Sequence, residues 1–387
     1  MPGARSAPRT RLSRAELFVL VLCFVCSVFV IIATQTVRDK PSAPVTAAGE
    51  GPSYKPHGRW DGEQICSTVD VVYTWVNGSD PAHKAEMRKY GGGGWDGGYR
   101  DYGVIRYSAR SVAKFMPWVR NIVIVTNGQV PNWVDTTSPR LCIVTHKEIF
   151  QNQKNLPTFN SNAIEANLRN VPGLAKYVLY LNDDFLVGAP LALSDFVDLQ
   201  SGLLKLNMGG FVAPNERGMR TNIWHRSVGH ANTLVNSVYH PDNPRAPHNY
   251  AGHVCYFLDR DVLAHMHAMW PAEFLATSRR KFRNGDDTSL PFLMVNVALE
   301  EHLGTRGSPI TSGYATWTHD HRRNAAAWKR LAASHAKCLC IQDGFEDSPN
   351  VDAEVAFLER QLCEMFPEKS SFERPEEPNP CDKYKKV

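Results

Sequence analysis

Four short runs of mostly apolar, often β-branched residues divide the first half of the chain, and turn-forming residues bound each of them. Unbroken runs of this length are typical of strands that are buried on both faces of a parallel or mixed sheet. Amphipathic segments fall between them. The predicted strands are Val69–Thr74, Ile122–Thr126, Leu141–Thr145 and Tyr177–Leu181, and the first predicted helices are Ile105–Phe115 and Ala163–Leu168. This alternation predicts an α/β fold with a central, mostly parallel or mixed sheet flanked by helices.

The second half of the sequence is more helical. Apolar residues recur every three or four positions in three segments, Asp259–Met269, Ser289–His302 and Val351–Met365. The last of these stops before Pro367, because proline disfavours continuation of a helix. Residues 373–387 are rich in proline and charge, and we expect this tail to be disordered.

The N-terminal region has the pattern of a membrane anchor. Leu17–Ala33 is an apolar run of seventeen residues without charge, close to the shortest length that spans a bilayer. Arginines precede this run, so the positive-inside rule predicts a type II protein with residues 1–14 cytoplasmic, a signal anchor at 15–34 and a luminal body. A cleaved signal peptide is the alternative. Residues 35–64 are expected to form a flexible stem before a domain at 65–372.

Composition places the body of the chain among ordinary globular proteins. Of 387 residues, 43% are hydrophobic and 21% are charged, and the net charge is +4. That charge is too small to indicate a nucleic-acid partner. Nine cysteines are present, two of them inside the predicted anchor. In a luminal compartment some of the other seven should pair, and their odd number leaves at least one free or intermolecular.

An acidic pair follows the fourth predicted strand. Asp183 and Asp184 should emerge at the edge of the sheet, directly after Tyr177–Leu181. A hard divalent cation is bound through one or two carboxylates, and substrate phosphate oxygens and water complete its shell. The pair is therefore a candidate site for Mg²⁺ or Mn²⁺. The alternative is a turn with two solvated aspartates.

Further polar residues follow the first strand. Asn77, Ser79 and Asp80 come after Val69–Thr74. Ligands of open α/β sheets bind at the carboxyl ends of strands, so these residues would face a crevice. A plain turn is the simpler explanation of the same sequence.

The remaining candidates also have structural alternatives. Arg106 and Arg110 lie four residues apart on one helical face, where they could clamp a diphosphate or simply be solvated. Glu165 follows Asn162 by three residues and is either a site carboxylate or a capping residue. Asp343 is a metal ligand or a turn residue. Composition alone does not single out His253 among the fourteen histidines.

Taken in chain order, these motifs resemble the four conserved regions of one family. They include Asp70–Pro81, Arg106-Tyr107-Ser108, Val125-Thr126-Asn127-Gly128-Gln129, Leu156-Pro157-Thr158-Phe159, Ala163-Ile164-Glu165, Leu181-Asn182-Asp183-Asp184 and Gly252–Arg260. The chain is similar, over about residues 66–81, 104–192, 250–303 and 337–373, to the Stealth family of sugar-phosphate transferases. That family includes the eukaryotic N-acetylglucosamine-1-phosphotransferase, to which the likeness is closest, and bacterial capsule hexose-1-phosphate transferases.

The resemblance implies roles for specific residues. The implied catalytic residues are Asp183, Asp184, Glu165 and His253. The implied substrate-binding residues are Asp70, Trp75, Asn77, Asp80, Arg106, Arg110, Asn127, Asn160, Ser161 and Arg283. Asp183, Asp184 and Asp343 are the implied ligands of Mg²⁺ or Mn²⁺. Cys255, Tyr256 and Gln342 depart from the family pattern, which puts donor or acceptor preference in doubt.

The resemblance also implies a reaction and a setting. The expected fold is a sheet of nucleotide-sugar transferase type. The expected reaction moves a hexose-1-phosphate from a nucleotide sugar, such as UDP-N-acetylglucosamine, onto a hydroxyl of a glycan or glycoprotein, with release of a nucleoside monophosphate. Expected partners are these substrates, a Golgi membrane reached through one N-terminal helix, and a second copy in a homodimer. The alternatives are a metal-dependent glycosyltransferase that releases a nucleoside diphosphate, and an inactive sugar-binding Golgi protein.

Overall fold

The computed structural model describes residues 69–92, 99–212, 222–307, 310–345 and 351–385. The predicted cytoplasmic tail, signal anchor and stem lie outside these residues. Within the described ranges, the chain has no helix that is both long and apolar enough to cross a membrane.

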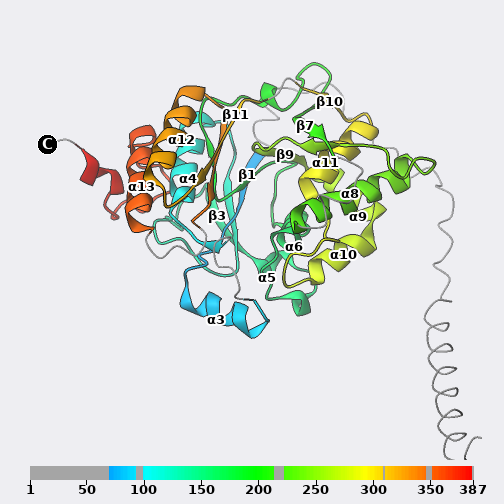
Figure 1. Cartoon of the computed structure of the whole chain (residues 1–387), viewed down its shortest axis with the longest axis horizontal. Coiled ribbons are helices and arrows are strands. Elements are labelled where there is room, and N and C mark those ends of the chain that lie inside the picture. Colours follow the sequence, from blue (N-terminus) through cyan, green and yellow to red (C-terminus); the bar gives the residue numbers. More distant parts are fainter. Residues whose placement is uncertain (1–68, 93–98, 213–221, 308–309, 346–350, 386–387) are drawn as a thin grey trace, which may run out of the picture. The chain divides into compact units, whose positions relative to one another are not determined.

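The central sheet has five strands in the order β3-β2-β1-β4-β9 (Figure 1). They are β1 (Val69–Thr74), β2 (Ile122–Thr126), β3 (Leu141–Thr145), β4 (Tyr177–Asn182) and β9 (Tyr256–Asp259). The first four run parallel, and β9 pairs antiparallel with β4. Every residue of β2 is buried, as are the first five of β1 and of β4. This confirms the predicted mixed, mostly parallel sheet and its four strands.

The strand order brings the ends of four segments to one edge. The order reverses between β1 and β4, and in sheets of this kind ligands bind at the carboxyl ends of the strands beside such a reversal. Strand β9 runs the other way, and its first residue Tyr256 pairs with Tyr180 near the end of β4. Residues just before β9 therefore meet the same edge as residues just after β4. This antiparallel strand is what brings His253 and the acidic pair together.

A second sheet continues from β4. Strand β5 (Phe185–Val187) follows directly after Asp183 and Asp184 and pairs antiparallel with β12 (Cys338–Asp343), which pairs in parallel with β11 (Ser312–Trp317). Helices α4 (Val104–Phe115), α12 (His321–Ser334) and α13 (Asp352–Met365) share one apolar core with this sheet, and Figure 1 shows them grouped beside β11. The acidic turn therefore joins two well-packed sheets.

A second group of helices follows residue 222, in the half of the sequence that is predicted to be more helical. It comprises α8 (Ile223–Tyr239), α9 (Arg260–Met269), α10 (Pro271–Arg279) and α11 (Leu290–Glu300). Helix α11 contacts both α8 and α9, is mostly apolar and has most of its residues buried. The shorter elements are α3 (Pro81–Lys89), α5 (His146–Ile149), α6 (Ser161–Glu165), and the strand pairs β6 (Leu204–Leu206) with β10 (Gly304–Arg306) and β7 (Met208–Phe211) with β8 (Asn249–Ala251).

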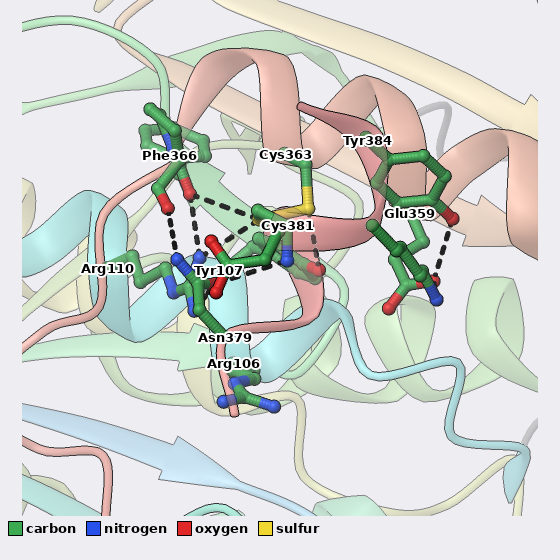
Figure 2. The surroundings of a disulfide bond; sticks show 12 residues. Arg106, Tyr107, Arg110, Glu359, Cys363, Phe366, Asn379, Cys381 and Tyr384 are labelled. Carbon is green, nitrogen blue, oxygen red and sulfur yellow. Dashed lines mark hydrogen bonds and ion pairs between the residues drawn. A yellow bond between two sulfur atoms is a disulfide. The ribbon is translucent and has the colours of Figure 1, made fainter. Parts of the chain in front are cut away.

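The prediction of a disordered tail after residue 372 is wrong. A disulfide joins Cys363 of α13 to Cys381, which lies in a 3₁₀ helix at Pro380–Tyr384 (Figure 2). The carboxylate of Glu373 is fully buried against α4. The proline and charge content that suggests disorder is offset here by a covalent bond and a buried ion pair.

That ion pair also corrects the predicted diphosphate clamp. Arg110 donates from Nε and Nη2 to both carboxylate oxygens of Glu373, at 2.7 and 2.9 Å, and Arg106 donates to Oε2 at 2.6 Å. Figure 2 shows Arg110 also reaching the carbonyl of Phe366 and the side chain of Asn379. The side chain of Arg110 is 2% exposed. The two arginines do share one helical face, but that face holds the C-terminal segment.

Candidate active site

The turn between β4 and β5 presents Asp184 with one carboxylate oxygen free. Its Oδ2 accepts a hydrogen bond from Sγ of Cys340 at 3.3 Å, and its carbonyl accepts from the backbone of Ile341 at 2.9 Å. Its Oδ1 is buried and has no hydrogen-bond partner among the residues that the structure describes. Burial raises the pKa of Asp184 to about 6, while the Cys340 bond and the charge of Arg283 act in the opposite direction. A buried carboxylate oxygen without a hydrogen-bond partner is unfavourable, and binding a proton or a cation stabilises it.

Asp183 lies beside a carboxylate that sequence reasoning missed. Burial, and next the negative charges of Asp184 and Asp101, raise the pKa of Asp183 well above its ordinary value. Asp101 is held in place by Nε1 of Trp75 at 3.0 Å and by the backbone of Gly103 at 2.7 Å. Burial raises the pKa of Asp101 as well. Asp183 is therefore repelled by two neighbouring carboxylates.

Such a group fits a divalent cation. Mg²⁺ and Mn²⁺ take oxygen ligands, and a cation would remove the repulsion that raises the pKa of Asp183. The free Oδ1 of Asp184 and the carboxylate of Asp183 would hold it, with Asp101 adjacent.

Asp343 does not fit the predicted metal set. Its Oδ2 accepts from Nε of Arg100 at 2.9 Å, and its Oδ1 accepts from Nη2 of Arg100 and from the backbone of Phe345. Tyr102 donates to it as well, at 3.3 Å. Both oxygens are already engaged, so Asp343 is an ion-pair partner here.

Glu165 is buried close to the acidic turn. It is the last residue of α6, whose N-cap is Asn160, so the capping explanation of Glu165 is wrong. Tyr180 donates to its Oε1 at 3.1 Å, and Thr74 lies 3.1 Å from the same hydroxyl. Burial raises the pKa of Glu165 to about 7, and the charge of Arg283 opposes this. Glu165 can therefore gain or lose a proton near neutral pH.

Arg283 supplies the positive charge of the site. It is exposed, and its Nε and Nη2 donate to Oγ of Ser161 at 3.0 and 2.8 Å. Its charge lowers the pKa of both Glu165 and Asp184, so the guanidinium acts on both carboxyl groups. An exposed arginine beside buried carboxylates is suited to binding an anionic substrate group.

A buried aspartate fixes the loop that carries Arg283. Asp287 is fully buried and accepts from the backbone of Asn284 at 2.8 Å and from Arg280 at 2.9 Å. It also accepts from Nδ2 of Asn160 at 2.8 Å. Asn160 is fully buried. The predicted contact between Asn160 and the substrate is therefore wrong, and the side chain instead helps to position this loop.

His253 lies beside Phe185, the residue that follows the acidic pair. Its side chain is exposed, and its ring contacts Phe185, with centroids 4.9 Å apart, and Tyr314, at 5.5 Å. Partial burial against these rings lowers the pKa of His253 below its ordinary value of 6.5. The ring is therefore neutral at pH 7 and can accept a proton.

The turns after β1 and β2 have local hydrogen bonds and are also joined to each other through Gln129, which bonds the backbone of Asn77. Asn77 Oδ1 accepts from the backbone of Ser79, and Asp80 caps α3 through the backbone of His83. Asn127 lies 3.1 Å from Nδ1 of His83 and is exposed. These bonds support the turn explanation, while leaving Asn127 accessible at the edge.

Asp70 is at the wrong end of its strand. It is the second residue of β1, 1% exposed, and its carboxylate receives two bonds from Arg120 at 2.9 and 2.6 Å and one from the backbone of Ala175. This corrects its predicted substrate contact, because both oxygens are satisfied at the amino edge of the sheet.

Three family models match this chain, and each matched region carries part of the site. They are Stealth conserved region 1 at residues 68–94, region 2 at 98–204 and region 3 at 252–296. The chain belongs to the Stealth family. Region 1 supplies Trp75, region 2 supplies Asp101, Glu165 and the acidic pair, and region 3 supplies His253 and Arg283.

Stealth relatives cover different shares of this chain. An exopolysaccharide phosphotransferase of Streptomyces coelicolor is 31% identical over 81% of the chain and 54% of its own length. A receptor polysaccharide phosphotransferase of Streptococcus oralis is 29% identical over 79% of the chain and 99% of its own length. The mouse N-acetylglucosamine-1-phosphotransferase subunits alpha/beta are 47% identical over 27% of the chain and 8% of theirs. The chain thus spans just over half of the first relative and a small part of the mouse protein.

Among solved structures, a galactosyltransferase in complex with donor and acceptor sugar analogues aligns over 79% of the chain and 98% of its own, with 11% identity and a TM-score of 0.35.

Proposed function

We propose that this Stealth chain is a phosphotransferase that moves a hexose-1-phosphate from a nucleotide sugar to a hydroxyl of a glycan. The observation that supports it most is the gathering of Asp183, Asp184, Glu165 and Arg283 at one sheet edge, with His253 beside the residue that follows the acidic pair. The names of its relatives, which are phosphotransferases of polysaccharides, support the same reaction class.

The proposed reaction breaks a phosphoanhydride bond. The acceptor hydroxyl attacks the phosphorus that bears the sugar, and the bond from that phosphorus to the bridging oxygen breaks. The nucleoside monophosphate leaves with that oxygen, and the acceptor loses its proton to a base. Phosphoryl transfer depends mainly on in-line positioning and on neutralisation of charge.

Each side chain has a role in this scheme. Asp183 and Asp184 would hold Mg²⁺ or Mn²⁺, which neutralises diphosphate charge when bound. Arg283 binds the same anionic group from the exposed side. His253 accepts the proton of the acceptor hydroxyl, because it is neutral near pH 7 and reaches solvent, where an acceptor glycan must enter. Glu165 is buried and accepts a hydrogen bond from Tyr180. Its negative charge would balance the positive charge of Arg283 beneath the donor.

The released nucleotide tests the proposal. The full chain is incubated with UDP-N-acetylglucosamine labelled in the phosphate next to the sugar, together with a short mannoside acceptor and Mg²⁺ or Mn²⁺. Release of UMP with labelled phosphate in the product is the expected result. Release of UDP with unlabelled product would establish the glycosyltransferase alternative instead. Other nucleotide sugars are run in parallel, and an Asp184→Asn variant is the blank.

We also propose a type II topology with the domain in the Golgi lumen. The support is the arginine bias before the apolar run at residues 17–33. Protease treatment of sealed microsomes should leave the C-terminal domain intact until detergent is added. Digestion without detergent would contradict this topology.

A further inference from the structure

Two histidines and a glutamate meet at the end of α11, away from the carboxylates of the acidic turn. His240 is the residue that follows α8, His248 precedes β8, and Glu300 is the last residue of α11. One ligand atom from each lies within 4.8 Å of the others. Among the described residues, this is the one group of three or more histidine, cysteine or acidic side chains whose ligand atoms all lie that close together.

The proton positions leave one nitrogen lone pair facing a carboxylate. Nδ1 of His248 lies 2.8 Å from Oδ1 of Asn232, and a carbonyl oxygen only accepts, so Nδ1 carries the proton. The amide of Asn232 is oriented by its Nδ2, which donates to the carbonyl of Ala246 at 3.4 Å. In the neutral ring Nε2 therefore has a lone pair, and it lies 3.5 Å from Oε1 of Glu300.

The other histidine lies close to the same carboxylate oxygen. Nε2 of His240 lies 3.0 Å from Oε1 of Glu300. A lone pair on His248 and a carboxylate oxygen repel each other unless a proton or a cation lies between them. The side chain of His248 is 5% exposed, so this lone pair and the carboxylate oxygen are largely shielded from water, and a cation bound by both would satisfy them.

The spacing suits one metal in particular. In a tetrahedral zinc site with bonds of about 2.0–2.1 Å, neighbouring ligand atoms are about 3.3–3.4 Å apart. The distances of 3.0 and 3.5 Å from Glu300 to the two rings bracket that value. Two imidazoles and one carboxylate are a known zinc-ligand set, whereas Mg²⁺ prefers oxygen ligands. The hydrogen bond from Nδ1 of His248 to Asn232 would hold the ring in place, as the other ring nitrogen of a zinc-binding histidine commonly does.

We propose that His240, His248 and Glu300 bind one Zn²⁺, with water in the fourth position. The ion would fasten the connection between α8 and β8 to the end of α11. Strand β8 leads within two residues to His253, so the site would also stabilise the segment from which His253 projects. The proposal does not depend on the reaction that the chain catalyses.

A neighbouring pair offers a matched control. His265 lies 3.3 Å from Oε1 of Glu301, whose carboxylate also accepts from Tyr239 at 2.6 Å. Glu301 directly follows Glu300 and also faces a histidine, but neither Glu301 nor His265 belongs to the group of three. Glu301→Gln and His265→Gln should therefore leave the zinc site intact.

The test measures zinc in the full-length protein. Protein stripped with a chelator is dialysed against zinc, freed of excess and analysed by elemental mass spectrometry, in an Asp184→Asn background to weaken binding at the acidic turn. One equivalent is expected in this parent and in the Glu301→Gln and His265→Gln controls, and less than about a tenth of that in His240→Gln and Glu300→Gln. Zinc, but not Mg²⁺, should raise the unfolding temperature of the parent.

X-ray absorption of the zinc-loaded parent gives a second measurement that needs no variant at the site. Scattering from two histidine rings is expected. Absence of retained zinc, absence of histidine scattering, or equal loss in the controls would overturn the proposal.

Discussion

The thiol of Cys340 donates a hydrogen bond to Oδ2 of Asp184 at 3.3 Å, from the strand that pairs with β5. Burial raises the pKa of Cys340 well above its ordinary value, so the sulfur keeps its proton and acts as a donor. One carboxylate oxygen of Asp184 is thereby fixed and the other is left free. Cys340 thus orients a candidate metal ligand.

Asp184→Asn should abolish turnover without unfolding the chain. The amide loses the charge that holds the cation, and we expect a loss of at least about 100-fold, in the range found when an electrostatic stabiliser is removed. Activity is measured against Mg²⁺ and Mn²⁺ concentration. Near-normal activity across both titrations would contradict the metal assignment.

The same substitution should stabilise the metal-free protein at neutral pH. The pKa of Asp184 is about 6 in the folded chain against 3.8 ordinarily, so between these values the folded state binds more protons than the unfolded state. This group's contribution to stability therefore falls as pH rises from about 4 to about 6. Thermal unfolding of metal-free protein should show a higher midpoint for Asp184→Asn than for wild type at pH 7, and a smaller difference at pH 4.

Cys340→Ala and Cys340→Ser should differ in their effect on metal affinity. The alanine removes the donor to Oδ2, which raises the pKa of Asp184 further, so protons compete better with the cation. The concentration of Mg²⁺ that gives half-maximal activity at pH 6.5 should rise in Cys340→Ala. The serine keeps a hydroxyl donor and should remain close to wild type. Equal effects of the two substitutions would mean that packing, not the hydrogen bond, is what matters.

The acid limb of the pH–rate profile should follow His253. A proton acceptor must be deprotonated, so kcat/KM should fall as the pH drops through the pKa of His253, which lies below 6.5. In His253→Gln this decrease at low pH should be absent from the residual activity. Tyr180→Phe provides the contrast, because removing its bond raises the pKa of Glu165 above about 7. A limb near pH 7 that moves upward in Tyr180→Phe would assign the base to Glu165.

Glu373→Gln should strongly destabilise the chain. The substitution leaves the buried guanidinium of Arg110 without its carboxylate, and breaking a buried pair costs about 3–5 kcal/mol. Urea unfolding with the Cys363–Cys381 disulfide intact measures the change. Glu359→Gln is the control, because its partner Lys383 is 57% exposed and surface pairs contribute about 1 kcal/mol or less. Equal effects would show that the buried pair adds little.

Local patterns predicted the frame of the fold well. The strands Val69–Thr74, Ile122–Thr126 and Leu141–Thr145 have the bounds that the sequence indicates, because apolar β-branched runs end at turn residues. The helix expected at Val351–Met365 begins one residue later, at Asp352. Continuous burial on both faces leaves these segments few other conformations.

The sequence does not indicate the role of a residue whose partner lies far along the chain. Arg106 and Arg110 do share a helical face, but Glu373 follows them by more than 250 residues, and spacing alone cannot indicate it. Asp101 was missed because its place beside Asp183 depends on Trp75 and on the path of the chain into α4. The glycine-rich stretch just before Asp101 was the available signal, since such stretches often accompany binding sites.

The pairing of β5 with β12 has a consequence for the order of synthesis. These strands are separated by about 150 residues, so the ribosome releases Asp184 and β5 long before Cys340 exists to meet them. Until then β5 has an open edge of unpaired backbone groups, which is a template for contact with other chains. High contact order of this kind slows folding. A chain that stops before residue 338 should therefore aggregate and not fold into a smaller transferase.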